Sequence, residues 1–474
     1  MRNFGWNLKH SYMKLPEMFY SEQKPSACAA PEVVMFNHEL AAELGLDASP
    51  LKEAADILCG NTLPAGAKPI AQAYAGYQFG HFATLGDGRA VLLGEQVFGQ
   101  KRVDVQLKGS GRTPYSRRGD GLAALLPMLR EYIISEAMAA LGIPTTRSLA
   151  VVRTGGQVIR ETALPGAVLV RTAASHIRVG TFNYAAAFGT KEDVAELADY
   201  TIWRHFPLLE SESNRYLLMF RETALRQADL IAKWQLTGFI HGVMNTDNTA
   251  ISGETIDYGP CAFMDTYNPG TVFSSIDTNG RYAYKNQPDI GAWNLARLAE
   301  AILPMLHEDA QTAVEIAREE LSRYWWRYHG QWLGGMRAKL GISNEEDGDE
   351  ALIDELLGLM AAERMDYTQT FLVLSEIRRA RLAPALVVWH QKWLARLKRQ
   401  ELDVDDAEAF MRTNNPAVIP RNHHVEQALA AAGQGDMSHI EDLLAHLRKP
   451  YEKSKKYGAP PESCDCGYKT FCGT

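Results

Sequence analysis

The chain has 474 residues, of which 46% are hydrophobic and 22% charged, a composition typical of folded globular proteins and unlike that of disordered or collagen-like chains. Its 57 acidic residues outnumber its 49 basic ones and give a net charge of -8, which argues against general binding of nucleic acids or of anionic membranes. No apolar run is long enough for a membrane helix and the start lacks the core of a secretion signal, so we expect a cytoplasmic protein that binds neither nucleic acid nor membrane.

Runs typical of short strands occupy the chain up to about residue 165, for example residues 89–95 and 102–108. From about residue 190, apolar residues recur every three or four positions, which predicts amphipathic helices. The predicted helices cover residues 195–204, 216–238, 290–306, 312–328, 371–380 and 385–398. A strand-rich front followed by a helix-rich back indicates an α+β protein with a cleft between two unlike lobes, although separate domains would leave the same pattern.

Glycines and arginines recur along the strand-rich half in an arrangement that favours a site for phosphate groups. Glycine lets the backbone approach an anion closely, and the planar guanidinium of arginine binds phosphate oxygens in pairs. The residues concerned are Gly86, Gly88, Arg89, Gly109, Gly111, Arg112, Arg117, Arg118, Gly119, Asp120, Gly121, Arg171 and Arg178. Each Gly-x-Gly alone indicates no more than a turn, but together with these arginines in an acidic chain they predict a polyphosphate pocket.

Lys108 ends a run of alternating apolar and polar residues, 103–108. In a strand, this alternation would bury the apolar side chains on one face and place Lys108 on the other. If that face lines a cleft, Lys108 can reach a phosphate group; otherwise it is a solvated lysine on a half-exposed strand. The expected partner of Lys108 is Glu131, in a helix that is predicted to begin near Pro127 and to end before Gly142.

The segment 238–260 carries the residues that say most about chemistry. We expect Ser252–Glu254 to form a tight turn between two short strands, in a hairpin that returns Asp257 to the side of Asn248. An amide oxygen and a carboxylate suit Mg²⁺, which would take its other ligands from water and from substrate phosphates. Asp247 would then lie close enough to accept a proton from an attacking hydroxyl group. The alternative is that these residues only stabilise turns.

Three cysteines, Cys464, Cys466 and Cys472, crowd the last eleven residues, whereas the other three are scattered and are expected to stay reduced. The tail lacks the paired Cys-x-x-Cys spacing of a zinc site, so inert thiols are its simplest interpretation. The sequence also lacks a Gly-x4-Gly-Lys-Ser/Thr loop, a His-Glu-x-x-His zinc site and a Gly-x-Ser-x-Gly nucleophile elbow.

Four long motifs stand out once these residues are taken together. They are Tyr74-Ala-Gly-Tyr-Gln-Phe-Gly-His-Phe82, Gln106-Leu-Lys-Gly-Ser-Gly-Arg-Thr-Pro-Tyr-Ser-Arg117, His241-Gly-Val-Met-Asn-Thr-Asp-Asn248 and Ile256-Asp-Tyr-Gly-Pro260. With them the chain resembles the selenoprotein O family, also called YdiU, a kinase-like fold whose members are protein adenylyltransferases. In ordinary protein kinases the residues that correspond to Asp247 and Asn248 are separated, and Asp-Phe-Gly stands where this chain has Asp257-Tyr-Gly.

The resemblance implies that AMP, rather than the terminal phosphate, passes from ATP to Ser, Thr or Tyr hydroxyls of proteins, because the nucleotide lies reversed in the cleft. It implies that Asp247 is the general base and that Asn248 and Asp257 bind the metal. The residues that it implies as nucleotide contacts are Gly86, Gly88, Arg89, Lys108, Asp120, Gly121, Glu131, Arg171, Arg178 and Asp257. Among these, Lys108 and Glu131 are implied to form the kinase-like lysine–glutamate pair.

The resemblance also bears on the tail. In the family, a terminal thiol can be linked to redox control through a disulfide, and Cys472 holds that place in this sequence. Its partner is left open among Cys261, Cys464 and Cys466.

We therefore expect a two-lobed, kinase-like α+β protein with a front lobe and N-terminal extension at 1–180, a helical lobe at 181–447 and a cysteine-containing tail at 448–474. Its predicted function is transfer of AMP from ATP to protein hydroxyl groups by a monomer, with Mg²⁺ or Mn²⁺ as cofactor. Two alternatives stay open. One is a conventional phosphotransferase that uses the same pocket with the γ-phosphate outward, and the other is a pseudokinase that binds ATP only as a regulatory or scaffolding module.

Overall fold

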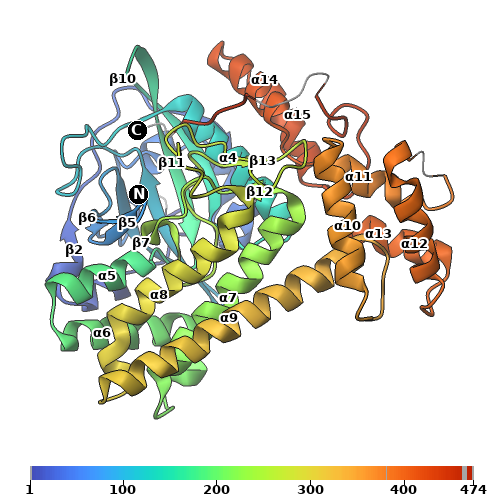
Figure 1. Ribbon diagram of the computed structural model, residues 1–474. Coiled ribbons are helices and arrows are strands. Elements are labelled where there is room, and N and C mark those ends of the chain that lie inside the picture. Colours follow the sequence, from blue (N-terminus) through green and yellow to red (C-terminus); the bar gives the residue numbers. More distant parts are fainter. Residues whose placement is uncertain (1–2, 380–381, 462–466, 472–474) are drawn as a thin grey trace.

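The computed structural model describes residues 3–379, 382–461 and 467–471. It is α+β, with a strand-rich first part and a helical second part, as the sequence predicts (Figure 1). The predicted helices are confirmed as α6 (Lys191–His205), α7 (Arg215–Thr237), α8 (Gln287–Leu306), α9 (Ala310–Lys339), α11 (Tyr367–Leu374) and α12 (Val387–Leu397). The helix α9 continues well beyond its predicted end, and α11 ends earlier than expected.

An antiparallel sheet forms the centre of the strand-rich part. Its strands follow the order β2 (Tyr20–Glu22), β4 (Ile70–Gln72), β7 (Ala90–Phe98), β8 (Lys101–Lys108), β11 (Ala163–Ala173), β10 (Arg147–Ile159) and β3 (Glu32–Phe36). Two short strands extend it, since β1 (Leu8–Lys9) pairs with β7 and β9 (Ala123–Ala124) pairs with β11.

Both faces of this sheet are covered, and alternation along each strand decides which layer a side chain meets. On one face, Val105 and Leu107 of β8 pack with the short helices α1 (His38–Glu43), α2 (Ala48–Lys52) and α3 (Ala55–Leu58). On the other face, Leu169 of β11 shares a core with the helix α4 (Leu125–Ala140). Lys108 points to the α4 face and is only 3% exposed, so the alternative of a solvated lysine is wrong.

The helical part has two hydrophobic cores. The helices from α5 (Val179–Phe188) to α9 share the larger core with α4, α14 (Asn422–Gly433) and α15 (Ser438–Leu447). The second core lies among α10 (Asp349–Ala362), α11, α12 and α13 (Val404–Asn414), where the rings of Trp389 and Trp393 stack. Figure 1 shows α9 as a long helix that connects the main body to this second group. Because α14 and α15 return to α4, the chain end comes back to the strand-rich part.

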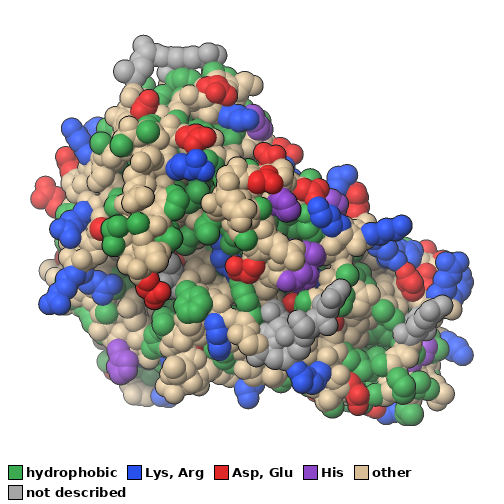
Figure 2. Space-filling model, turned by 90° about the horizontal axis from the view of Figure 1, so that it is seen from above, with side chains coloured by type: hydrophobic (Ala, Val, Ile, Leu, Met, Phe, Trp, Pro, Cys, Tyr) green, Lys and Arg blue, Asp and Glu red, His purple; other side chains and the backbone are tan. Residues whose placement is uncertain are grey.

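Within the described residues, no helix combines the length and the apolar character that crossing a membrane requires. Figure 2 shows acidic and basic side chains interspersed on the face that it presents.

Candidate active site

The centre of the site is a buried ion-pair cluster on the α4 face of the sheet. Lys108, the last residue of β8, places its Nζ 2.6 Å from Glu131 Oε2 on α4 and 2.6 Å from Asp257 Oδ1. Arg171 of β11 reaches the same two carboxylates, at 2.7 Å from Asp257 and 3.3 Å from Glu131. The predicted pairing of Lys108 with Glu131 is therefore present in the structure, and Asp257 joins it.

Arg178, the residue before α5, completes the cluster. Its Nη1 lies 2.9 Å from Asp257 Oδ2 and donates to the backbone carbonyl of Asp247 at 2.6 Å. Burial opposes ionisation of Asp257, but the positive charges of Arg171, Lys108 and Arg178 outweigh it and hold the pKa of this carboxyl well below its ordinary value. Asp257 is thus an anion that three cations hold in place.

Asp247 lies next to this cluster in a tightly closed setting. Its Oδ1 is buried, and none of the described residues forms a hydrogen bond to it. Burial raises the pKa of Asp247 to about 6, against the opposing charge of Arg178. Gly76 passes directly over this carboxylate, because a Cβ added there would lie 2.1 Å from Asp247 Oδ1. Only a glycine allows the backbone this approach.

The prediction of a hairpin around Ser252–Glu254 is wrong. Strand pairing occurs instead at the ends of the segment, where β12 (Phe239–Ile240) pairs with β13 (Ala262–Phe263). In between, Ala250 bridges to Arg178 and Thr255 bridges to Thr145, so the two halves pair with other parts of the chain. The segment is therefore a loop closed at its base, and Arg178, bonded to both aspartates, is what joins Asp247 to Asp257.

The two candidate metal ligands have defined conformations. The side-chain Nδ2 of Asn248 donates a hydrogen bond to the carbonyl of Val243 at 2.9 Å. The amide oxygen of Asn248 is therefore the atom that could bind a metal ion. Asp257 has a φ of 64°, a left-handed conformation that is uncommon outside glycine and that is typical of functional sites. Both ligands are hard oxygen donors, and a divalent ion such as Mg²⁺ binds through one or two of these plus water and phosphate.

The glycines predicted to contact a nucleotide serve close packing in the structure. A Cβ at Gly86 would lie 2.4 Å from the ring of Tyr115, and one at Gly121 would lie 2.1 Å from the carbonyl of Gly111. A Cβ at Gly88 would lie 2.9 Å from the backbone carbonyl oxygen of Tyr115, and the carbonyl of Arg89 accepts a hydrogen bond from Gly109 N at 2.7 Å. These glycines therefore fold the loops at the ends of β7 and β8 tightly together.

Asp120 stands apart from the cluster in its contacts. It forms an ion pair with Arg160 at 2.8 Å and accepts a hydrogen bond from Leu122 N at 2.9 Å. The hydrogen bonds to Arg160 lower the pKa of this exposed carboxyl. No contact in the described structure joins Asp120 to Lys108, Glu131 or Asp257.

Sequence reasoning missed two polar residues that support the cluster, Asp87 and Gln106. Asp87 is buried between Gly86 and Gly88, where its Oδ2 accepts from Gln106 Nε2 at 3.0 Å. Gln106 in turn accepts from Arg171 Nε at 2.8 Å. Burial raises the pKa of Asp87 to about 6, although the charge of Arg178 opposes this shift. The sequence signal for Asp87 is its position between Gly86 and Gly88, two glycines that are themselves predicted to contact the nucleotide.

A small hairpin covers the loop that carries Asp247. Its strands are β5 (Ala75–Gln78) and β6 (His81–Thr84), which belong to the first of the four motifs. Tyr77 N donates to Thr246 Oγ1 at 2.9 Å, and Phe79 N donates to Asn245 Oδ1 at 3.1 Å. These bonds fix the hairpin against the residues that precede Asp247.

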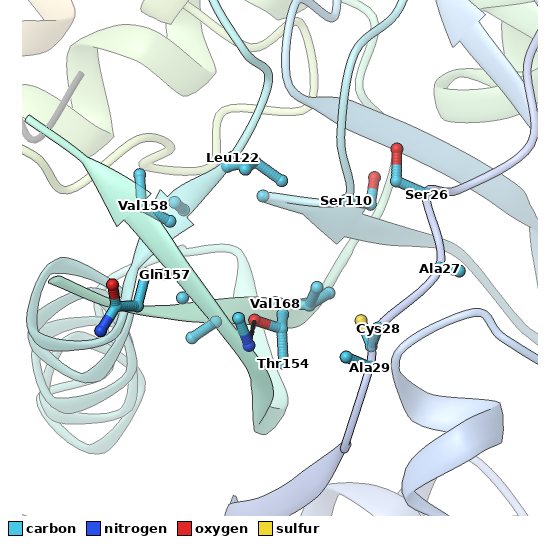
Figure 3. Close-up of a pocket in the computed structure, with 15 residues that line it drawn as sticks. Ser26, Ala27, Cys28, Ala29, Ser110, Leu122, Thr154, Gln157, Val158 and Val168 are labelled. Atoms are coloured by element: carbon cyan, nitrogen blue, oxygen red, sulfur yellow. Dashed lines mark hydrogen bonds between the residues drawn. The ribbon is translucent and has the colours of Figure 1, made fainter. Parts of the chain in front are cut away.

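A separate cavity of about 140 Å³ opens on the strand-rich part (Figure 3). It lies between the segment Ser26–Ala29 and the strands that carry Thr154, Val158 and Val168. Gly109, Ser110 and Leu122 also line it, and Gly109 is the one lining residue that also belongs to the predicted polyphosphate pocket. At the predicted site, ion pairs join Lys108, Arg171 and Arg178 to Asp257.

The end of the described chain docks beside the loop of Asp257. Thr470 Oγ1 donates to the carbonyl of Pro260 at 2.6 Å, and Ser275 N donates to Thr470 O at 3.0 Å. The neighbouring Cys261 is buried, and burial raises the pKa of its thiol to about 12. Cys464, Cys466 and Cys472 lie outside the described residues, so a disulfide with Cys261 stays a prediction.

Comparison with known proteins shows the family to which the chain belongs. Residues 4–448 match the family model described as protein adenylyltransferase SelO. The chain belongs to this family. A protein nucleotidyltransferase YdiU from Bacillus cytotoxicus is 59% identical over 481 residues, which cover 99% of this chain and 98% of the relative. Proteins of the same name from Bacillus cereus and Bacillus anthracis are 58% and 57% identical, each over 99% of both chains. The resemblance inferred from the four motifs is thereby confirmed.

Proposed function

We propose that the chain transfers AMP from ATP to the hydroxyl groups of Ser, Thr or Tyr residues in proteins. The reaction would take place in a kinase-like cleft between a lobe at 1–180 and a lobe at 181–447, with a tail at 448–474. The observation that carries this proposal is the meeting of Lys108, Arg171 and Arg178 on Asp257, directly beside the buried Asp247. Membership of the adenylyltransferase family supports transfer of the nucleotide rather than of its terminal phosphate.

The three cations are the proposed phosphate site. Because these cations are buried, water screens their charges little, and each would attract a phosphate group strongly. Incoming phosphate oxygens would compete with Asp257 for these cations, and arginine is suited to bind such oxygens in pairs. The loops around Gly86, Gly88, Arg89, Asp120 and Gly121 are proposed to contact the rest of the nucleotide.

Asn248 and Asp257 would hold the divalent ion, with Mg²⁺ or Mn²⁺ as candidates. The ion would neutralise charge on the phosphates when bound. Asp257, once phosphate takes over its cations, offers carboxylate oxygens, and Asn248 offers its amide oxygen. The donor set therefore fits a hard cation that shares its remaining positions with water and substrate.

Asp247 is the proposed general base. In the reaction the acceptor oxygen forms a bond to the α-phosphorus, the bond to the β-phosphate oxygen breaks, and pyrophosphate leaves. The hydroxyl proton passes to the carboxylate of Asp247, whose pKa of about 6 is close to the pH at which a base works best near neutrality. Lys108, Arg171 and Arg178 would stabilise the charge that develops on the phosphates.

Labelled ATP separates this proposal from its alternatives. Protein should take up label from ATP labelled at the α-phosphate and none from the γ-phosphate, whereas a conventional phosphotransferase gives the reverse and an ATP-binding scaffold gives neither. Asp247→Ala should abolish transfer and leave ATP binding largely intact, while Lys108→Ala should weaken both. Lys101→Ala is the matched control, because this lysine lies on the same strand but is exposed. Transfer of the γ label alone would refute the proposal. A cytoplasmic location and a monomeric state stay predictions from the sequence.

A further inference from the structure

A group of half-buried and exposed aromatic side chains lies on the hairpin β5–β6 and on the helices α5 and α8 beside it. We call it the rim patch, and it consists of Tyr77, Phe82, Tyr184, Phe188 and Trp293. Ring centroids are 5.3 Å apart between Tyr77 and Phe82, 5.5 Å between Tyr77 and Trp293 and 6.3 Å between Phe82 and Phe188. Phe82 is 42% and Phe188 is 55% exposed. Figure 1 shows the hairpin next to α5, the helix that carries Tyr184 and Phe188.

The rim patch is continuous with the residues around Asp247. Tyr77 supplies a ring to the patch, and its backbone N donates to Thr246, the neighbour of Asp247. Gly76, one residue earlier, passes over the Asp247 carboxylate itself. A protein whose hydroxyl group reached Asp247 would therefore come close to this hairpin.

A cation that pairs with no carboxylate of the described residues adjoins the patch. The guanidinium of Arg281 lies 4.7 Å from the ring centroid of Trp293 and beneath Gly80, at the turn of the hairpin. The carboxylate of Asp277 accepts from the backbone N of Arg281 and of Tyr282 and not from the Arg281 guanidinium. Arg281 forms no ion pair with any carboxylate in the described ranges, whereas the nearby Arg297 is paired with Glu300 at 2.6 Å. Arg281 thus places a positive charge beside the half-buried ring of Trp293 in the rim patch.

We propose that the rim patch and Arg281 form the docking surface for the acceptor protein. The segment that binds there would carry apolar side chains next to its acceptor hydroxyl, to cover Phe82 and Phe188, and an acidic side chain to pair with Arg281. Exposed aromatic surface of this kind is typical of interaction sites, since aromatic residues and arginine contribute much of the binding energy at interfaces. This inference rests on the proposed function and adds to it a rule for choosing substrates.

Two synthetic peptides with the same single tyrosine test the proposal. One has leucine and glutamate flanks, the other serine and glutamine flanks, and AMP transfer from α-labelled ATP is measured at a range of peptide concentrations. Phe82→Ser and Phe188→Ser should each raise KM for the first peptide about tenfold, the loss expected for one buried phenylalanine contact. KM for ATP should stay unchanged. Phe98→Ser is the matched control, an equally exposed phenylalanine on β7, and should leave KM for both peptides unaltered.

A charge exchange tests the part assigned to Arg281. Arg281→Glu should raise KM for the glutamate peptide and lower it for a version in which lysine replaces glutamate. This reversal would not result from a mere loss of structure. Equal KM values for the two peptides in the unaltered protein, or equal effects of Phe82→Ser and Phe98→Ser, would overturn the docking proposal while α-label transfer continued.

Two further outcomes are also decisive. If the protein were a dimer that Phe82→Ser converted to a monomer without a change in peptide KM, the patch would be a contact between copies and the proposal would be wrong. If the unaltered protein transferred no α label to any acceptor, itself included, the proposed function would fail first, and with it the basis for this inference.

Discussion

Replacement of Asp247 by asparagine should make the protein more stable and much less active. In the fold, burial raises the pKa of this carboxyl from its ordinary 3.8 to about 6, a difference of roughly two units. At 1.36 kcal/mol per unit, keeping Asp247 ionised inside the fold costs about 3 kcal/mol. Asp247→Asn keeps the shape and removes the charge, so it should recover up to that amount above pH 7. If Asp247 is the base, transfer of AMP should fall about 10² to 10⁴-fold.

The sign of the pH dependence makes this prediction specific. Because the folded-state pKa is raised, the cost of ionised Asp247 is fully present above pH 6 and disappears as the pH falls below 3.8. Asp257→Asn is the control of opposite sign, since it leaves three buried cations without their shared anion and should destabilise by about 3 to 5 kcal/mol. Thermal unfolding of the unaltered protein, Asp247→Asn and Asp257→Asn between pH 4 and pH 8 measures both changes in stability. A stability advantage of Asp247→Asn that did not shrink towards pH 4 would refute the reasoning.

Two further replacements test other parts of the structure. Gly76→Ala should displace the hairpin β5–β6, because the added Cβ would lie 2.1 Å from Asp247 Oδ1. AMP transfer should fall about 10²-fold while ATP binding persists. Gly358→Ala, where a Cβ meets open space, is the control for the transfer assay and the binding assay. Lys339→Met should stabilise the protein, because burial lowers the pKa of Lys339 from 10.5 to about 7. At pH 6.5 the gain in stability should be about 3 kcal/mol, after about 2 kcal/mol is allowed for the lost contact of Lys339 Nζ with the Phe371 ring. The gain should vanish towards pH 10.5. A gain that grew with pH would contradict this reasoning.

The parts of the fold that could be predicted are those with a local pattern. The helices α7 and α8 each bury one stripe of residues, and their periodicity shows this without knowledge of the partner. The pair of Lys108 and Glu131 could be predicted because a strand alternation and a long apolar helix specify a face for each. In both cases the information lies within a few turns or one strand of the chain.

The loop between β12 and β13 could not be predicted in this way. Its paired strands, β12 and β13, are two residues long, which is too short to show an alternation of apolar and polar residues. They also lie outside the predicted turn at Ser252–Glu254. What holds Ala250 and Thr255 is pairing with Arg178 and Thr145, which come from distant parts of the chain. The turn residues Ser252 to Glu254 are real turn formers, but tertiary pairing decides what the turn connects.

Register explains why the charged residues of the site meet at all. Gln106 lies opposite Arg171 in the pairing of β8 with β11, and Lys108 lies opposite Leu169. The buried side chains between them, Leu107 and Val170, face the other layer. A shift of one residue would exchange the two faces, placing Lys108 among apolar side chains and moving it away from Glu131. The apolar alternation that builds the sheet is therefore also what delivers Lys108 and Arg171 to Asp257, where Arg178 joins them from the start of α5.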